Sequence, residues 1–175
     1  MEALLAFAAA LLALRLSGLL VGRWRRGREP QFAAWAAGLG AYAVASAALS
    51  WGAASGWSDS VFRFYYLFGG LLTAPLLGVG SLLLAGRRWA APVGLVYLGL
   101  SVGVAVAAPL TSPVAGGSIP EAQEHLDFFP ARLLAVLGNT LGTLAVVGVA
   151  LLTIGRRPLG NALIVAGVAV AAAGG

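Results

Sequence analysis

A short acidic segment near position 120 carries the one arrangement of side chains that is typical of a metal site. Glu121, Glu124 and His125 stand at positions i, i+3 and i+4, so a helix would place all three on one face. Carboxylate and imidazole groups in that arrangement could hold zinc or another divalent ion. The chain has one histidine and no second ligand motif. The alternative is a solvated acidic helix that lies on the outer membrane surface.

A candidate ligand site begins the third apolar stretch, where Arg63, Tyr65 and Tyr66 stand together. An aromatic-lined pocket that opens outward could receive an anionic group on Arg63, and Asn139 of a later stretch could line the same cavity. The alternative is an aromatic belt, because amphipathic rings favour the membrane interface. Pro75 cannot bond to the carbonyl four residues earlier, so we predict a kink beneath the pocket.

Glycines at positions i and i+4 occur in two apolar stretches, as Gly99 with Gly103 and as Gly138 with Gly142. This spacing lets two membrane helices approach closely, and we expect a structural role for both pairs. Asn139 could hydrogen-bond across the second contact. The alternative for Asn139 is a place on a substrate or ion path.

Several kinds of chemistry are excluded by residues that the chain lacks. It has no cysteine, which removes disulfides and thiolate metal sites, and no lysine, which removes a retinal Schiff base. A single histidine cannot hold a bis-histidine haem across the membrane. The acidic residues lie outside the apolar stretches, which argues against a proton-coupled pump. We therefore expect no cofactor and favour a function that is not enzymatic.

The elements that must position these residues are membrane helices. Of the 175 residues, 60% are hydrophobic and 10% are charged, whereas a soluble domain carries roughly 25% charged residues. The apolar stretches are continuous and near the ~20 residues that span a bilayer as a helix. We predict an all-α, polytopic transmembrane bundle forming a single domain over residues 1–175, with about six helices at residues 3–21, 32–54, 62–85, 90–109, 132–154 and 159–175.

The connections predict the orientation of this bundle. One side of the membrane receives eight arginines and the other side receives two, Arg63 and Arg132. Arginine-rich loops stay in the cytoplasm, so the amino terminus lies outside. The arginines that we expect to contact anionic lipids on the cytoplasmic face are Arg23, Arg25, Arg26, Arg87, Arg88, Arg156 and Arg157.

The long outer connection, residues 110–131, is the place where a short interfacial helix is expected. Residues 118–121 fit a capping box, with Ser118 as N-cap and Glu121 returning to its backbone, and the helix would run to Phe129. Asp59 and Asp127 on this side could pair with Arg63 and Arg132.

The six helices form three hairpins, whose cytoplasmic turns share glycine followed by arginine. The last stretch has 17 residues, and a seventh helix could follow it in a longer chain. Arg15 lies inside the first stretch, where it could pair with a group in a central cavity or extend toward the headgroups.

Three functions remain, in this order. The first is a sensor, assembly or accessory membrane domain without enzymatic activity. The second is a small oligomeric transporter or channel, and the third is a lipid-modifying enzyme that uses the acidic and histidine side chains of the outer loop. We expect the protein in a cell membrane, namely the bacterial cytoplasmic membrane. Its expected partners are the lipid bilayer and either another membrane subunit or a second copy of the chain. We expect no nucleic-acid partner, because the arginines end apolar stretches instead of forming a solvated basic face with aromatics.

Overall fold

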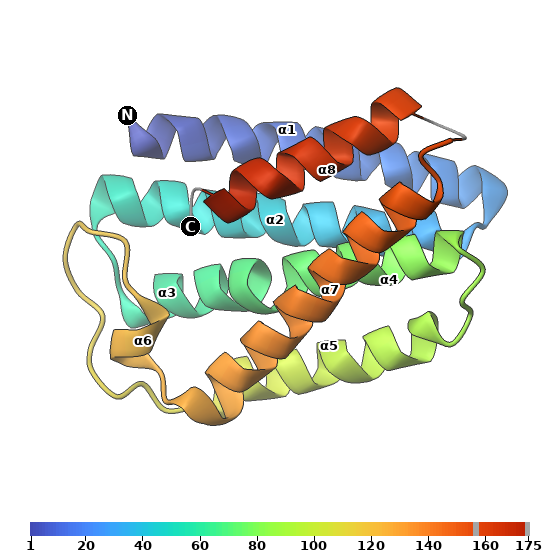
Figure 1. The fold of residues 1–175 in the computed structure, drawn as a ribbon. Coiled ribbons are helices and arrows are strands. Elements are labelled where there is room, and N and C mark those ends of the chain that lie inside the picture. The colour runs from blue at the N-terminus through green and yellow to red at the C-terminus, as the bar shows by residue number, and fades with distance from the viewer. Residues whose placement is uncertain (156–157, 174–175) are drawn as a thin grey trace.

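A computed structural model describes residues 1–155 and 158–173. Helices form the segments that are long enough to span a membrane (Figure 1). The segment from Asp59 to Leu84 combines α- and π-helical parts. The segment from Phe128 to Leu152 begins with a kink at Phe129, whose backbone is not helical, and continues as α7. The elements are α1 (Glu2–Gly27), α2 (Pro30–Ser55), α3 (Asp59–Tyr65), η1 (Tyr66–Leu72), α4 (Thr73–Leu84), α5 (Ala90–Ala107), α6 (Ala122–His125), η2 (Phe128–Arg132), α7 (Leu133–Leu152) and α8 (Pro158–Ala173).

Five of these helical segments are long and apolar enough to cross a membrane, and the all-α bundle predicted from the sequence is confirmed. The sixth apolar helix, α8, is shorter than the other five. Large apolar side chains lie exposed along the spans; Leu95, for example, is 71% exposed. Exposed large apolar side chains in every span suit a surface that faces lipid. The chain is therefore a multi-pass membrane protein.

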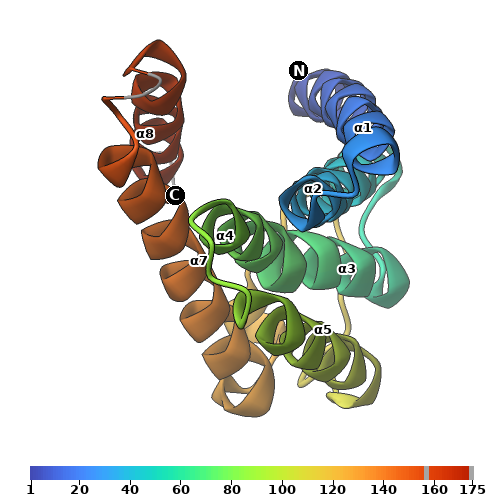
Figure 2. The same ribbon diagram turned by 90° about the vertical axis from the view of Figure 1, so that its right-hand side faces the viewer.

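The helices run back and forth between two ends of the molecule. α1, α2, the α3–η1–α4 segment and α5 lie side by side with alternating direction, while α7 crosses them diagonally (Figure 1). The end view shows that α7 and α8 diverge from α1 and α2, so the two pairs enclose an open angle (Figure 2). α1 packs mainly on α2, α2 packs on α4, and α4 packs on α7.

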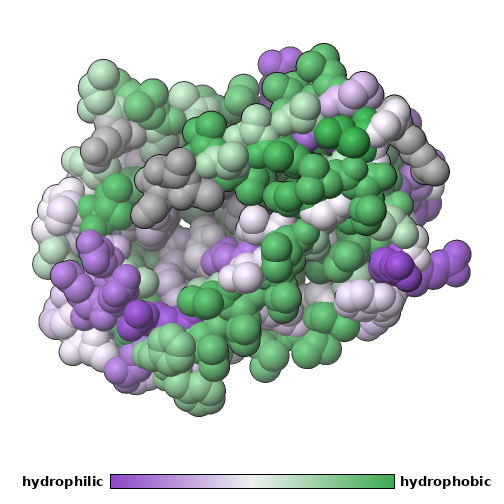
Figure 3. All heavy atoms as spheres, viewed as in Figure 1, coloured by the Kyte–Doolittle hydropathy of each residue, from purple (hydrophilic) through white to green (hydrophobic). Residues whose placement is uncertain are grey.

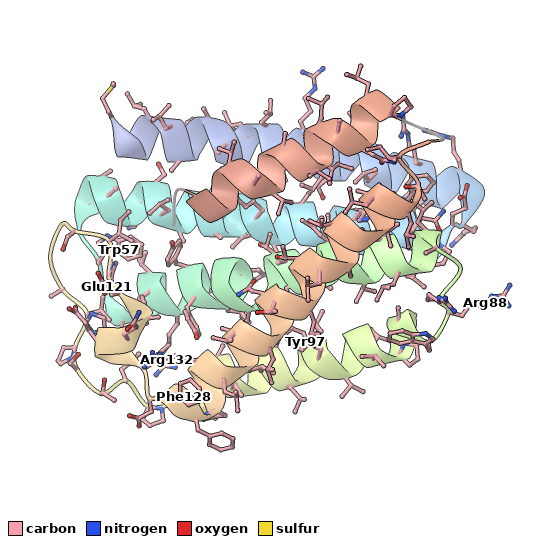
Figure 4. All side chains as sticks on the ribbon, viewed as in Figure 1. Trp57, Arg88, Tyr97, Glu121, Phe128 and Arg132 are labelled. Atoms are coloured by element: carbon pink, nitrogen blue, oxygen red, sulfur yellow. The ribbon has the colours of Figure 1, made fainter. Side chains whose placement is uncertain are left out.

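Charged residues gather at the two ends of the bundle. Arg88 lies at one end, and Trp57, Glu121, Phe128 and Arg132 lie at the other (Figure 4). The space-filling view shows hydrophilic colour at these ends and a mostly hydrophobic surface over the helices between them (Figure 3). This distribution is the one that a membrane-spanning bundle requires, with an apolar girdle between two polar caps.

Two helix boundaries differ from the sequence prediction because local signals extend the helices. α1 continues to Gly27, six residues past the predicted end, since arginine favours helix as well as leucine does. It stops at Arg28, which takes a left-handed conformation with φ 53° just before Glu29 and Pro30. At the other end of the bundle α3 begins at Asp59, because the Ser58 hydroxyl accepts the amide of Val61 at 3.5 Å.

The helix in the outer loop is shorter than the predicted interfacial helix. α6 is a single turn of four residues, Ala122–His125, and Glu121 is its N-cap without a side-chain bond. The predicted capping box and the continuation to Phe129 are therefore wrong. Leu126 turns into an extended conformation and is 5% exposed, so its burial in the core competes with helix continuation. Phe129 is also extended, as expected for a residue before proline.

Candidate functional site

A π-helix and a proline interrupt the hydrogen bonds of the third span. η1 widens the helix just before Pro75, which has no amide hydrogen to give to the carbonyl of Leu71. Backbone carbonyls released in this way cannot bond to lipid and need donors from the protein. The interruption therefore creates a set of acceptors inside the bundle.

Side chains from three helices supply those donors. Asn139 of α7 donates its Nδ2 to the Gly70 carbonyl at 2.7 Å. The Tyr97 hydroxyl of α5 lies 2.9 Å from the Leu71 carbonyl and 3.2 Å from that of Leu134, between α5 and α7 (Figure 4). Thr73 donates its hydroxyl to the Phe68 carbonyl at 2.7 Å, and this carbonyl also accepts the Thr73 amide. We call Thr73, Tyr97 and Asn139 the carbonyl-capping cluster.

Close packing of α7 surrounds this cluster. A Cβ on Gly142 would stand 2.6 Å from the carbonyl carbon of Ala74 and 2.8 Å from the nitrogen of Pro75, and a Cβ on Gly138 would overlap the Tyr97 hydroxyl. Gly142 thus allows α7 to touch the interrupted span directly, and Gly138 leaves room for the Tyr97 side chain of α5. Gly99 and Gly103 behave differently, because both are exposed and a Cβ there would meet nothing within 4 Å. The helix contact expected at this second pair is not made within the part of the chain that the structure describes.

The guanidinium of Arg63 forms hydrogen bonds within the protein. Its Nη1 and Nη2 donate to the carbonyls of Ala105 and Ala108, at 2.7 and 2.9 Å. These carbonyls belong to the end of α5, where no intrahelical donors remain and the helix dipole favours positive charge. Arg63 therefore caps the carboxyl-terminal end of α5, which is a structural role.

Tyr66 lies one turn after Arg63 and lines a small cavity with it. The cavity has a volume of about 10 Å³, and its other walls are apolar side chains of Phe62, Leu126 and Ala131. The Tyr66 side chain is 8% exposed, and its hydroxyl has no hydrogen-bond partner among the described residues. A space of this size accommodates about one water molecule, which suits a single unpaired hydroxyl.

Tyr65 lines a different and larger space. A groove of about 310 Å³ lies between α2 and the third span, with Tyr42 and Ser46 on one side and Tyr65 and Thr73 on the other. Successive helix residues point about 100° apart, so Tyr65 and Tyr66 cannot face the same narrow cavity. We call this space the α2–η1 groove.

The four residues predicted to form one ligand site are thus divided. Arg63 and Tyr66 share the small cavity, Tyr65 faces the α2–η1 groove, and Asn139 belongs to the carbonyl-capping cluster. The structure does not bring the four together in one space, because helix rotation turns Tyr65 away from Arg63 and Tyr66 and because Asn139 bonds to the Gly70 carbonyl.

The predicted metal ligands do not assemble either. The His125 ring lies edge to face with Phe62, and its Nδ1 is 2.8 Å from the Ser112 hydroxyl. Glu121 and Glu124 are exposed. Because Glu121 precedes the helix instead of lying within it, the predicted common face does not form. In the part of the chain that the structure describes, no group of three histidine, cysteine, aspartate or glutamate side chains could hold a metal ion.

Asp59 has a partner other than the expected arginine. Asp59 accepts the amide of Val114 at 2.8 Å, which ties the outer loop to the start of α3. Arg132 lies over the Phe128 ring, 5.7 Å from its centroid. The loop is held further by Trp57, whose amide donates to the Gly116 carbonyl at 2.8 Å. These contacts fold the outer loop against the bundle.

The arginines proposed for lipid contact lie at the opposite end and are exposed there: Arg23, Arg25, Arg26, Arg87 and Arg88. Arg156 and Arg157, the remaining two, lie outside the described residues.

Sequence reasoning missed Tyr97, Tyr42 and Ser46. The signal for Tyr97 was available, because a tyrosine in the middle of an apolar span needs an acceptor that only another helix can offer. Tyr42 and Ser46 sit four residues apart and share a helix face, which could have marked them as a pair. Comparison with protein-family models, with curated proteins and with solved structures finds no match. Function is therefore argued from this geometry.

Proposed function

We propose that this protein is a non-enzymatic, multi-pass membrane domain that serves assembly, as an accessory or sensor subunit of a larger membrane complex. The observation that carries this proposal is the set of hydrogen bonds made by the carbonyl-capping cluster and by Arg63. Their donors are engaged with backbone carbonyls of the bundle itself, at 2.7 to 3.2 Å. Polar side chains used in this way stabilise a scaffold and leave little for a substrate path.

The arrangement of the spaces supports the same proposal. A transporter needs polar residues of several helices that converge on one continuous cavity. Here the small cavity of about 10 Å³ and the α2–η1 groove of about 310 Å³ share no lining residue. The broad apolar surfaces of α1 and α5 remain uncovered in the single chain. Such surfaces are available to other membrane proteins.

The proposed placement puts the arginine-rich end in the cytoplasm of a bacterial cell membrane. Exposed arginines of α1 and of the α4–α5 connection would lie at the level of anionic headgroups, where each contributes about 1 kcal/mol. The outer loop, with its acidic residues, would then face the outside.

Photo-cross-linking in native membranes tests the assembly role. A photoreactive residue is placed at Leu12 of α1 or at Leu95 of α5, which are 63% and 71% exposed. We expect a discrete protein adduct from at least one of the two positions, with a matched probe at Leu152 of α7 as the comparison. Adducts with lipid alone from every position would contradict an assembly role.

A second candidate function is the binding of an amphiphilic small molecule in the α2–η1 groove. The groove volume lies at the lower end of the range for small-molecule sites. Its walls combine small apolar residues with the hydroxyls of Tyr42 and Tyr65, which suits a ligand with one polar group. Ser46→Leu, which fills the groove, should abolish binding of such a ligand, while Ser50→Leu outside the groove should not.

A further inference from the structure

Arg15 occupies the middle of α1 on the side that faces away from the bundle. α1 packs on α2 through Ala6, Ala10 and Ala13, and Ser17 continues this stripe by donating its hydroxyl to the Ala36 carbonyl at 2.7 Å. Arg15 follows Ala13 by two residues, which turns it about 200° from the stripe. Its side chain is exposed. No other element of the described chain packs extensively on α1.

The depth of Arg15 makes this position costly. α1 has 26 residues, which corresponds to about 39 Å, and Arg15 lies near its midpoint. The next arginine, Arg23, is about 12 Å further along the axis. Helical side chains lean toward the amino-terminal end, which is away from Arg23 and the arginine-rich face. A guanidinium at this depth costs about 2.5–3.5 kcal/mol unless an acceptor relieves it.

The surroundings of Arg15 offer no acceptor of their own. The exposed neighbours within one turn are Gly18 and five leucines: Leu11, Leu12, Leu14, Leu16 and Leu19. The six acidic residues of the sequence lie at or beyond the ends of the spans, as Glu2, Glu29, Asp59, Glu121, Glu124 and Asp127. A second copy of the chain therefore cannot bring a carboxylate to the middle of the membrane.

We propose that the outer face of α1 docks a transmembrane helix of a different protein, which carries a carboxylate at the depth of Arg15. Charge complementarity selects this occupant, because ionisable groups within a membrane pair with one another. The flanking leucines would pack along the same partner helix. This proposal rests on the assembly function and names the chemistry of the partner.

A model helix tests the proposal directly. The full chain is reconstituted in phosphatidylcholine vesicles with labelled leucine-based transmembrane peptides that carry glutamate, glutamine or leucine at the central position. We expect energy transfer to show at least tenfold tighter association of the glutamate peptide than of the leucine peptide. Arg15→Leu should abolish that preference and Arg15→Lys should retain it. Arg23→Leu, which removes an arginine at the end of α1, is the matched control and should keep the preference.

Equal association of the three peptides with the wild-type chain would overturn the proposal, as would an unchanged preference in Arg15→Leu. Association that appears only when anionic lipid is added, irrespective of the peptide, would assign Arg15 to headgroup phosphate and also overturn it. These outcomes leave the assembly function standing if cross-linking from Leu95 still gives a protein adduct. Loss of every protein adduct from both Leu12 and Leu95 would instead remove the assembly function itself.

Discussion

Replacing Gly142 by alanine should force α7 away from the interrupted span. The new Cβ would stand 2.6 Å from the carbonyl carbon of Ala74 and 2.8 Å from the nitrogen of Pro75, whereas ordinary contact begins at 3.4 Å. These atoms are backbone, so they cannot rotate away as a side chain would. The nearest atom, the carbonyl oxygen of Ala74, lies closer still, so the helices must separate by about 1 Å to restore contact distance.

The cost of this separation follows from the contacts along α7. Overpacking of a close interface costs roughly 1–3 kcal/mol. A shift of this size also draws Asn139 from its 2.7 Å bond with the Gly70 carbonyl toward the limit of a hydrogen bond, at a cost of about 0.6 kcal/mol. We therefore expect the free energy of unfolding to fall by about 2–3 kcal/mol.

Steric trapping or denaturant unfolding in bicelles measures this change, and Gly148→Ala is the matched control. Gly148 lies on the same helix, and a Cβ there would meet nothing within 4 Å. The control should leave the free energy of unfolding unchanged or raise it slightly, because alanine favours helix over glycine. Equal stabilities of Gly142→Ala and Gly148→Ala would refute the close contact between α4 and α7.

Four further substitutions test the packing of the helices. Asn139→Leu and Tyr97→Phe should each lower the free energy of unfolding in bicelles by about 0.6–1.7 kcal/mol, because each removes a donor to a carbonyl inside the bundle. Arg63→Met should cost about 1.5–3 kcal/mol in the same measurement, since a charged donor to the end of α5 is lost. Gly99→Ala should change the monomer's stability by less than about 0.5 kcal/mol, because its Cβ points into open space.

Controls separate these effects from a general loss of folding. Thr140→Val, on the same helix as Asn139 but exposed, should leave stability unchanged. Arg63→Lys keeps one charged donor near the end of α5 and should recover part of the loss in Arg63→Met. Full stability of Asn139→Leu or Tyr97→Phe would show that the carbonyls find donors elsewhere. A large loss in Gly99→Ala would place this face of α5 in an interface with another chain.

The helices and their order could be predicted from the sequence because hydropathy and length depend on local composition. Each predicted apolar stretch corresponds to a helix, from α1 to α8. The contact of Gly142 was also accessible, because glycine spacing in an apolar helix favours close packing. The same spacing at Gly99 predicted a helix contact that is not made in the described part of the chain. Glycine spacing alone does not reveal which face of a helix is covered.

The candidate site was less predictable, since it depends on helix rotation and on competition between local and distant contacts. Arg63, Tyr65 and Tyr66 are close in sequence, but successive helix residues point about 100° apart, which turns Tyr65 away from the cavity that Arg63 and Tyr66 line. The outer helix had a local capping signal, yet burial of Leu126 ends it after one turn. Single-sequence patterns contain neither the helix rotation nor the burial that decides these outcomes.

Labelling of single cysteines tests most directly the claim that the two ends of this bundle lie on opposite sides of the membrane, with the arginine-rich end inside. The natural chain has no cysteine, so Ala85→Cys at the arginine-rich end and Ser118→Cys in the outer loop each give one exposed thiol. In intact cells a membrane-impermeant maleimide should label Ser118→Cys at once and Ala85→Cys only after permeabilisation. Labelling of both thiols from one side, or the reverse pattern, would contradict the claim.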